Sequence, residues 1–237
     1  GLLFCGTECG VYVSFDDGDH WQSLALDMPT TSVRDLKIKG SDLVAATYGR
    51  GFFILDDYAP LREVTPATLS EAAHIYKPST AIRVRRSVNG ATPFPPEVPT
   101  AKNPPAGATI YYSLGSKPSG EIKMEIVDRE GRVVRHLSSV APKPYDNPPA
   151  LVPDFWADPR APLPTNVGMN KMVWDLRHDT PPAFNHDLSD VMVANVGETP
   201  SGYIGPFCLP GDYEVRLMVD GHTYTQKLHV DNDPRSP

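Results

Sequence analysis

Residues 14–21, SFDDGDHW, gather three aspartates around one glycine. Carboxylates this close together could bind Ca²⁺ or serve as a catalytic acid and base, but the spacing departs from the alternating oxygen ligands and terminal Glu of an EF-hand loop. Ser14, Asp16, Gly18 and Trp21 instead suit a hairpin corner. Ser and Asp oxygens accept from turn N–H groups, Gly adopts positive φ, and Trp anchors the corner to a sheet. We therefore predict a structural turn here.

A second stretch with possible metal chemistry is RHDTPPAFNHD, which repeats a His-Asp pair within a proline-bearing loop. Imidazole and carboxylate groups could bind zinc or iron if the loop folded back on itself. His-Asp pairs on exposed loops are common, however, and nothing else in the sequence fixes their geometry. We predict no metal and no cofactor, and we retain four residues as candidate ligands: His178, Asp179, His186 and Asp187.

Arg50 stands between two glycines in YGRG, at a predicted strand corner. An arginine there could bind a carboxylate or a sugar, or pair with Asp56 or Asp57 in the neighbouring segment. The second candidate for ligand binding is Trp156, in a proline-rich loop. No Ser-His-Asp order, phosphate-binding glycine loop or Cys-x-x-Cys pair accompanies them.

Aromatic side chains suggest a further alternative, a sugar-binding module in which rings stack on the ligand. Its candidate rings are Trp156, Trp174, Tyr111 and Tyr112. Trp174 lies inside the apolar run KMVWDL, which favours a place in the core.

Composition limits the function classes. The chain has 237 residues with 26 Pro, 18 Gly and a net charge of −7, and Lys and Arg are spread thinly. We predict a globular protein of short elements, with no nucleic-acid partner and no membrane span. The three cysteines leave at least one thiol unpaired: Cys5 and Cys9 flank a predicted corner and could form a disulfide or stay free, and Cys208 stands alone.

The sequence predicts that short strands position these residues along the whole chain. Residues 1–57 contain evenly spaced runs with Gly and Asp corners, typical of an antiparallel meander. DLVAATY and FFIL are almost unbroken apolar runs, which predicts strands covered on both faces. Beyond the connector, EIKMEIVD with GRVVRHL, and YEVRLMVDGHTYTQKLHV, predict two hairpins of an immunoglobulin- or fibronectin-like sandwich. Proline-rich stretches at 87–107 and 141–166 predict long loops.

The pattern Ser-x-Asp-x-Gly-x-x-Trp at 14–21 closely resembles the Asp-box, or BNR repeat, of β-propellers in the sialidase, sortilin and xyloglucanase superfamily. Residues 1–24 look like a blade of bacterial BNR-repeat glycosyl hydrolases and sortilin-like proteins, and residues 33–64 look like their closing blade. His20 departs from the Thr that is usual in the box. The rest resembles, through MVWDLRHDTPP and LPGDYEVRLMVDG, the Ig-like domain that follows the propeller.

The resemblance implies an all-β protein: a terminal blade or two at 1–60, a connector at 61–75, and an Ig-like sandwich at 76–237. A propeller needs at least about four blades of four strands, so the missing partner would be upstream blades of a longer chain. The implied setting is extracytoplasmic, and the implied role is non-catalytic scaffolding, or binding of carbohydrate or protein. The alternative is part of an active glycoside hydrolase whose two carboxylates lie mostly in the missing blades.

Overall fold

The computed structural model describes residues 1–84, 97–98, 105–141, 161–182 and 204–235. Within these ranges the chain is mostly β structure, with several small antiparallel sheets, a curled five-stranded half-barrel sheet and one short α-helix. The prediction of an all-β fold is confirmed. Trp156, His186 and Asp187 lie outside the described residues.

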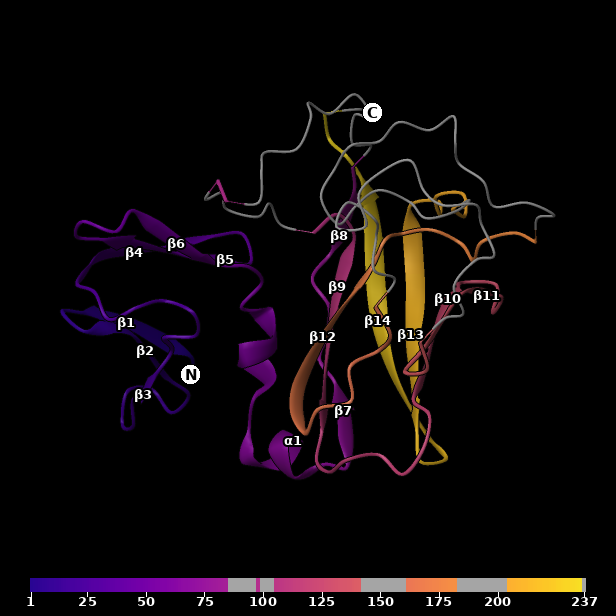
Figure 1. Ribbon diagram of the computed structural model, residues 1–237, viewed down its shortest axis with the longest axis horizontal. Coiled ribbons are helices and arrows are strands. Elements are labelled where there is room, and N and C mark those ends of the chain that lie inside the picture. Colours follow the sequence, from indigo (N-terminus) through magenta and orange to yellow (C-terminus); the bar gives the residue numbers. More distant parts are fainter. Residues whose placement is uncertain (85–96, 99–104, 142–160, 183–203, 236–237) are drawn as a thin grey trace.

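The N-terminal part consists of two three-stranded antiparallel sheets that stack on each other (Figure 1). Their facing sides enclose a small core that includes Val11, Leu43 and Phe53. Sheet A contains β1 (Leu3–Thr7), β2 (Gly10–Ser14) and β3 (Gln22–Ser23), and sheet B contains β4 (Val33–Lys39), β5 (Asp42–Thr47) and β6 (Phe52–Leu55).

Side chains alternate between the two sides of sheet B along β5 and β6, and only one of these sides packs against sheet A. Residues Leu43, Ala45 and Phe53 point toward sheet A, so their neighbours in sequence point the other way. On that outer side Phe52 is 75% exposed and Ile54 is 58% exposed. The prediction that both faces of these strands are covered is therefore wrong for this chain, because only one sheet packs against sheet B within the described residues.

A short helical segment joins the two parts of the chain. A 3₁₀ helix, η1 (Ala59–Glu63), leads into α1 (Pro66–Ser70). Thr65 caps α1, since its side chain accepts from the Thr68 N–H while the Thr68 hydroxyl bonds back to the Thr65 N–H. Strand β7 (Ala73–Ile75) then begins within the stretch predicted as connector and already belongs to the larger part.

The larger part packs two sheets around one core that contains Trp174, Ile126 and Leu217, all buried (Figure 1). Sheet C has the order β12-β9-β7, and sheet D has the order β11-β10-β13-β14-β8, with β8 parallel to β14. The remaining strands are β8 (Ala81–Arg83), β9 (Ala108–Leu114), β10 (Lys123–Asp128), β11 (Val133–Ser138), β12 (Gly168–Trp174), β13 (Gly211–Val219) and β14 (His222–Asn232).

Both predicted hairpins of sheet D are confirmed. In the turn between β13 and β14, Asp220 and Gly221 adopt φ of 47° and 83°, the backbone that a two-residue hairpin loop with native twist requires. In the turn between β10 and β11, Asp128 accepts main-chain hydrogen bonds from Glu130 and Arg132. Local turn chemistry thus sets both registers.

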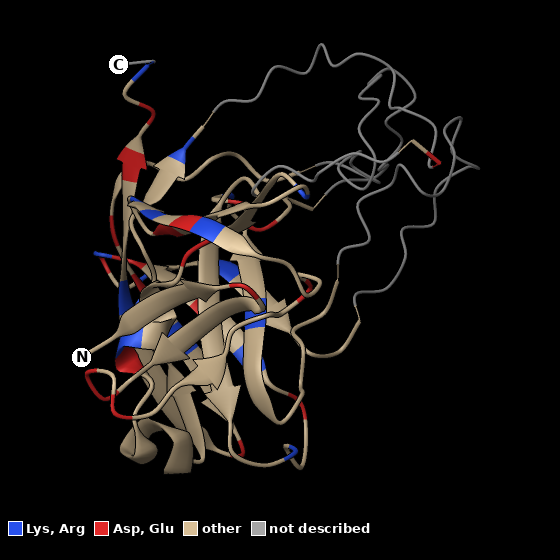
Figure 2. Cartoon of the chain, turned by 90° about the vertical axis from the view of Figure 1, so that its left-hand side faces the viewer, with Lys and Arg blue, Asp and Glu red and all other residues tan. Residues whose placement is uncertain are grey.

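Residues of both charges are interspersed along the described chain rather than gathered in one segment (Figure 2). Strand β4, for example, carries Arg34, Asp35 and Lys37 in close succession. Among the described helices, none is long and apolar enough to cross a membrane.

Candidate functional site

The turn at 14–21 joins β2 to β3 and is held by its own side chains. Buried Ser14 Oγ accepts from the Gly18 N–H at 2.9 Å and donates to Asp16 Oδ1 at 2.8 Å. Asp16 Oδ1 also accepts from the His20 N–H at 2.9 Å, and Trp21 Nε1 donates to the Gly18 carbonyl at 2.9 Å. Gly18 has φ of 104°, a conformation that L side chains rarely adopt. Each residue of the pattern therefore has a place in the turn.

The same contacts determine the charge state of Asp16. Hydrogen bonds from the His20 main chain, the His20 ring and Ser14 lower the pKa of Asp16 to about 2. A general acid must carry a proton near the working pH, so this carboxyl is unsuited to that role. Both carboxylate oxygens of Asp16 already have partners in the turn: Oδ1 accepts from Ser14 and from the His20 N–H, and Oδ2 lies 2.6 Å from His20 Nδ1.

Arg50 occupies the turn between β5 and β6, where Gly49 and Gly51 both have positive φ. The Gly51 carbonyl accepts from the Thr47 N–H and hydroxyl, which closes the turn. The Arg50 side chain is exposed and has no hydrogen bond or ion pair with any residue of the described chain. The alternative pairing with Asp57 is not formed, since Asp57 Oδ1 accepts from the Ser79 hydroxyl at 2.7 Å and from the Ala59 N–H.

Aromatic side chains flank this arginine. Tyr48 and Phe52, on either side of the turn, are 73% and 75% exposed. The Arg34 guanidinium lies 5.2 Å from the centroid of the Tyr48 ring, a cation–π distance. Together with Ile54, Val44 and Ala46, these residues form what we call the outer face of sheet B.

Of the four candidate metal ligands, His178 and Asp179 lie within the described residues. The Asp179 carboxylate accepts from the His136 N–H at 2.9 Å, and its other oxygen lies 2.5 Å from His136 Nδ1. His178 is held through its main chain, with its N–H bonded to the Pro206 carbonyl. Nowhere in the described chain do three His, Cys, Asp or Glu side chains meet in a way that could hold a metal ion.

A sugar-binding module needs exposed aromatic rings, but two of the four candidate rings are buried. Trp174 is 1% exposed, and its Nε1 donates to the Arg177 carbonyl, so its predicted place in the core is confirmed. Tyr112 is fully buried and donates its hydroxyl to the Pro164 carbonyl. Tyr111 is half-buried, with Lys171 Nζ 5.8 Å from its ring centroid. Trp156 is the remaining candidate, and it lies outside the described residues.

All three cysteines are free thiols. Cys5 and Cys9 are exposed, whereas Cys208 is fully buried in the core of the larger part. Burial raises the pKa of the Cys208 thiol to about 12, which makes it inert as a nucleophile.

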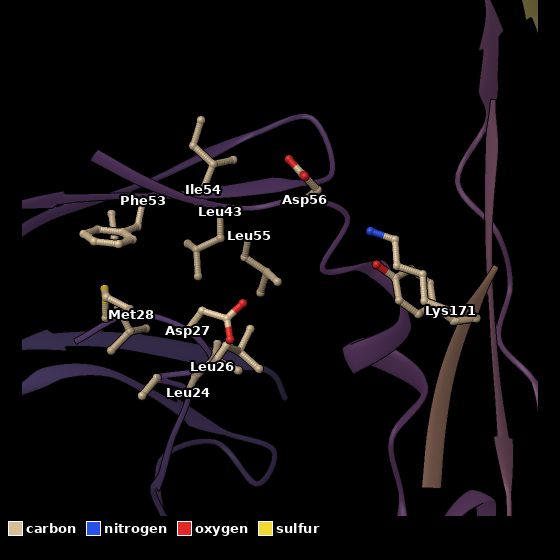
Figure 3. Close-up of a pocket in the computed structure, with 14 residues that line it drawn as sticks. Leu24, Leu26, Asp27, Met28, Leu43, Phe53, Ile54, Leu55, Asp56 and Lys171 are labelled. Atoms are coloured by element: carbon tan, nitrogen blue, oxygen red, sulfur yellow. The ribbon is translucent and has the colours of Figure 1, made fainter. Parts of the chain in front are cut away.

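Sequence reasoning missed a cavity of about 270 Å³ at one end of the stacked sheets A and B, where they face sheet C (Figure 3). Apolar side chains form its walls and three charged groups surround its opening. The charged groups are Asp27, Asp56 and Lys171. They come from three separate elements, so no spacing in the sequence could have signalled that they meet.

No family model, curated protein or solved structure matches this chain.

Proposed function

We propose that this chain is a non-catalytic part of an Asp-box propeller protein, in which sheets A and B are neighbouring blades and the larger part is an Ig-like sandwich. Two features support this proposal. The side chains of Ser14, Asp16 and Trp21 and the main chain of Gly18 all serve the β2–β3 turn, as the Asp-box resemblance implies. The two sheets also stack face to face, the arrangement that adjacent blades adopt in a propeller.

The role we propose is to bind protein through the outer face of sheet B. This face carries two highly exposed aromatic rings and the aliphatic residues of β5 and β6, bordered by Asp35 and Lys37 of β4, and apolar patches rimmed by polar residues mark sites of association. Its natural partner is another β-sheet, because the opposite face of the same sheet already packs on sheet A with similar apolar residues. We infer that this partner is an upstream blade of a longer parent chain, as the Asp-box resemblance implies.

The exposed Phe52 ring is the observation that carries the proposal. Sheet packing would bury Phe52 together with Ile54 and Val44, whereas a sugar would engage the aromatic rings and Arg50 and leave the aliphatic surface in water. The aliphatic part of the face therefore favours a protein surface over a carbohydrate.

The test is self-association of the chain followed by analytical ultracentrifugation. We expect weak, concentration-dependent association that Phe52→Ser reduces and that Leu209→Ser, at an apolar residue 74% exposed on the larger part, leaves intact. Equal association of the two variants would overturn the assignment of this face.

A second assay separates the other functional classes. The chain is incubated with a panel of β-glucans and sialylated glycans, and both retention and release of reducing ends are measured. We expect neither. Retention that Arg50→Ala abolishes would replace protein by carbohydrate as the ligand, and release of reducing ends would overturn the non-catalytic role and favour the glycoside hydrolase alternative.

A further inference from the structure

The cavity at the end of the stacked sheets combines an apolar interior with a charged opening (Figure 3). Its walls come from both sheets of the smaller part and from the loop that leaves sheet A. Figure 3 shows Phe53, Leu43, Leu55, Leu24 and Met28 around the interior.

The opening carries two carboxylates and one ammonium group. Asp27 follows sheet A, Asp56 follows β6, and Lys171 extends from β12 on sheet C (Figure 3). None of the three side chains has a hydrogen bond or ion pair with another residue in the described ranges. Lys171 Nζ lies 5.8 Å from the centroid of the Tyr111 ring, and no carboxylate of the described residues forms an ion pair with it.

Tyr111 also lines the cavity and lies close to Asp56. Burial, followed by the nearby carboxylates of Asp57 and Asp56, raises the pKa of its hydroxyl to about 12. The phenol therefore stays neutral and can donate a hydrogen bond beside the opening.

The size of the cavity limits the ligand. At roughly 30 Å³ per water-sized atom, 270 Å³ holds about nine non-hydrogen atoms. A purely apolar molecule of this size would bring an apolar surface to three charged groups and partly desolvate them without compensation. An aliphatic carboxylate would face two carboxylates, and an aliphatic amine would leave Lys171 without a partner.

We propose that this cavity binds a free α-amino acid with an apolar side chain, such as leucine. The side chain enters the space between Leu43, Phe53 and Leu55. The α-ammonium group pairs with Asp27, and the α-carboxylate pairs with Lys171. The ligand enters from the side that faces sheet C, whereas the proposed protein contact uses the outer face of sheet B, and Ile54 borders both.

The affinity should be modest. A ligand of about nine non-hydrogen atoms at an exposed opening reaches a dissociation constant on the order of 0.1 to 1 mM. Glycine, which has no side chain to fill the interior, should bind at least about tenfold more weakly than leucine, since each 1.4 kcal/mol of lost apolar contact is a factor of ten.

The experiment is calorimetric titration of the whole chain with L-leucine and two truncated analogues, 3-methylbutylamine and 4-methylpentanoate. We expect leucine to bind at least about tenfold more tightly than either analogue, because each lacks one of the two charges. Methyl resonances of Leu43 and Leu55 should shift on leucine binding, which locates the ligand. Absence of leucine binding at 10 mM, roughly tenfold above the weakest expected constant, or equal binding of the analogues, would overturn the proposal.

Matched variants test the charge pairing. Lys171→Met should weaken leucine binding about tenfold and leave 3-methylbutylamine unaffected, whereas Lys227→Met, at an exposed lysine of β14, should change neither. Asp27→Asn should weaken leucine and the amine together. If Lys171→Met binds leucine as well as Lys227→Met does, the assigned role of Lys171 is refuted.

Discussion

The turn at 14–21 makes a quantitative prediction for Ser14→Ala. Ser14 is fully buried, and its Oγ accepts from the Gly18 N–H at 2.9 Å and from the Asp16 N–H at 3.4 Å. Alanine removes this acceptor and leaves a main-chain donor unsatisfied, at a cost of about 2 kcal/mol. The equilibrium constant for opening of the turn and sheet A should therefore rise about 30-fold.

The matched control for this change is Ser23→Ala. Ser23 lies on β3 of the same sheet, is exposed, and makes no side-chain hydrogen bond within the described residues. Its replacement should change the free energy of unfolding by less than about 0.5 kcal/mol.

Two measurements read out the difference. Urea denaturation gives the global free energy of unfolding, and amide hydrogen exchange of the Leu24 N–H, which donates to the Val11 carbonyl beside the turn, gives the local one. We expect Ser14→Ala to lower both the global and the local free energy of unfolding, and Ser23→Ala to lower neither. Equal exchange rates at Leu24 in the two variants would refute the assignment of Ser14 as the acceptor that organises the turn.

Three further predictions concern pH, backbone space and thiol chemistry. The pKa of Asp16 is about 2 in the folded chain and near its ordinary value in the unfolded chain. The ionised carboxylate therefore stabilises the folded chain above about pH 4, and this contribution is lost as pH falls toward 2. Asp16→Asn should abolish that part of the pH dependence of the urea midpoint. Gly107 has φ of 140°, and an added Cβ would lie 2.1 Å from the Trp174 carbonyl oxygen, so Gly107→Ala should lower stability by more than about 1 kcal/mol in thermal denaturation, while Gly120→Ala, in open space, should not. A thiol reagent at pH 8 should modify the two exposed cysteines quickly and Cys208 only after denaturation, and protection of either exposed thiol by a disulfide would contradict the structure.

Features governed by neighbours in sequence were predictable from the residues alone. The spacing of Ser14, Asp16 and Gly18 predicted the turn because the donors and acceptors that close it lie within four residues of one another. The Asp220-Gly221 hairpin followed for the same reason, since two positive φ angles determine how the strands return. Trp174 was assigned to the core from the apolar residues around it.

Features governed by packing between distant segments required the tertiary structure. The alternation of β6 shows that Phe52 and Phe53 point in opposite directions, but only the placement of sheet A decides that Phe53 is covered and Phe52 is exposed. Asp179 bonds to His136, 43 residues earlier in the chain, a partner that the sequence of its own loop does not indicate. Lys171 lines the cavity because its strand belongs to sheet C, which faces the open end of the smaller part. In each case the local pattern is compatible with several neighbours, and the choice among them depends on packing free energy between elements that are far apart in sequence.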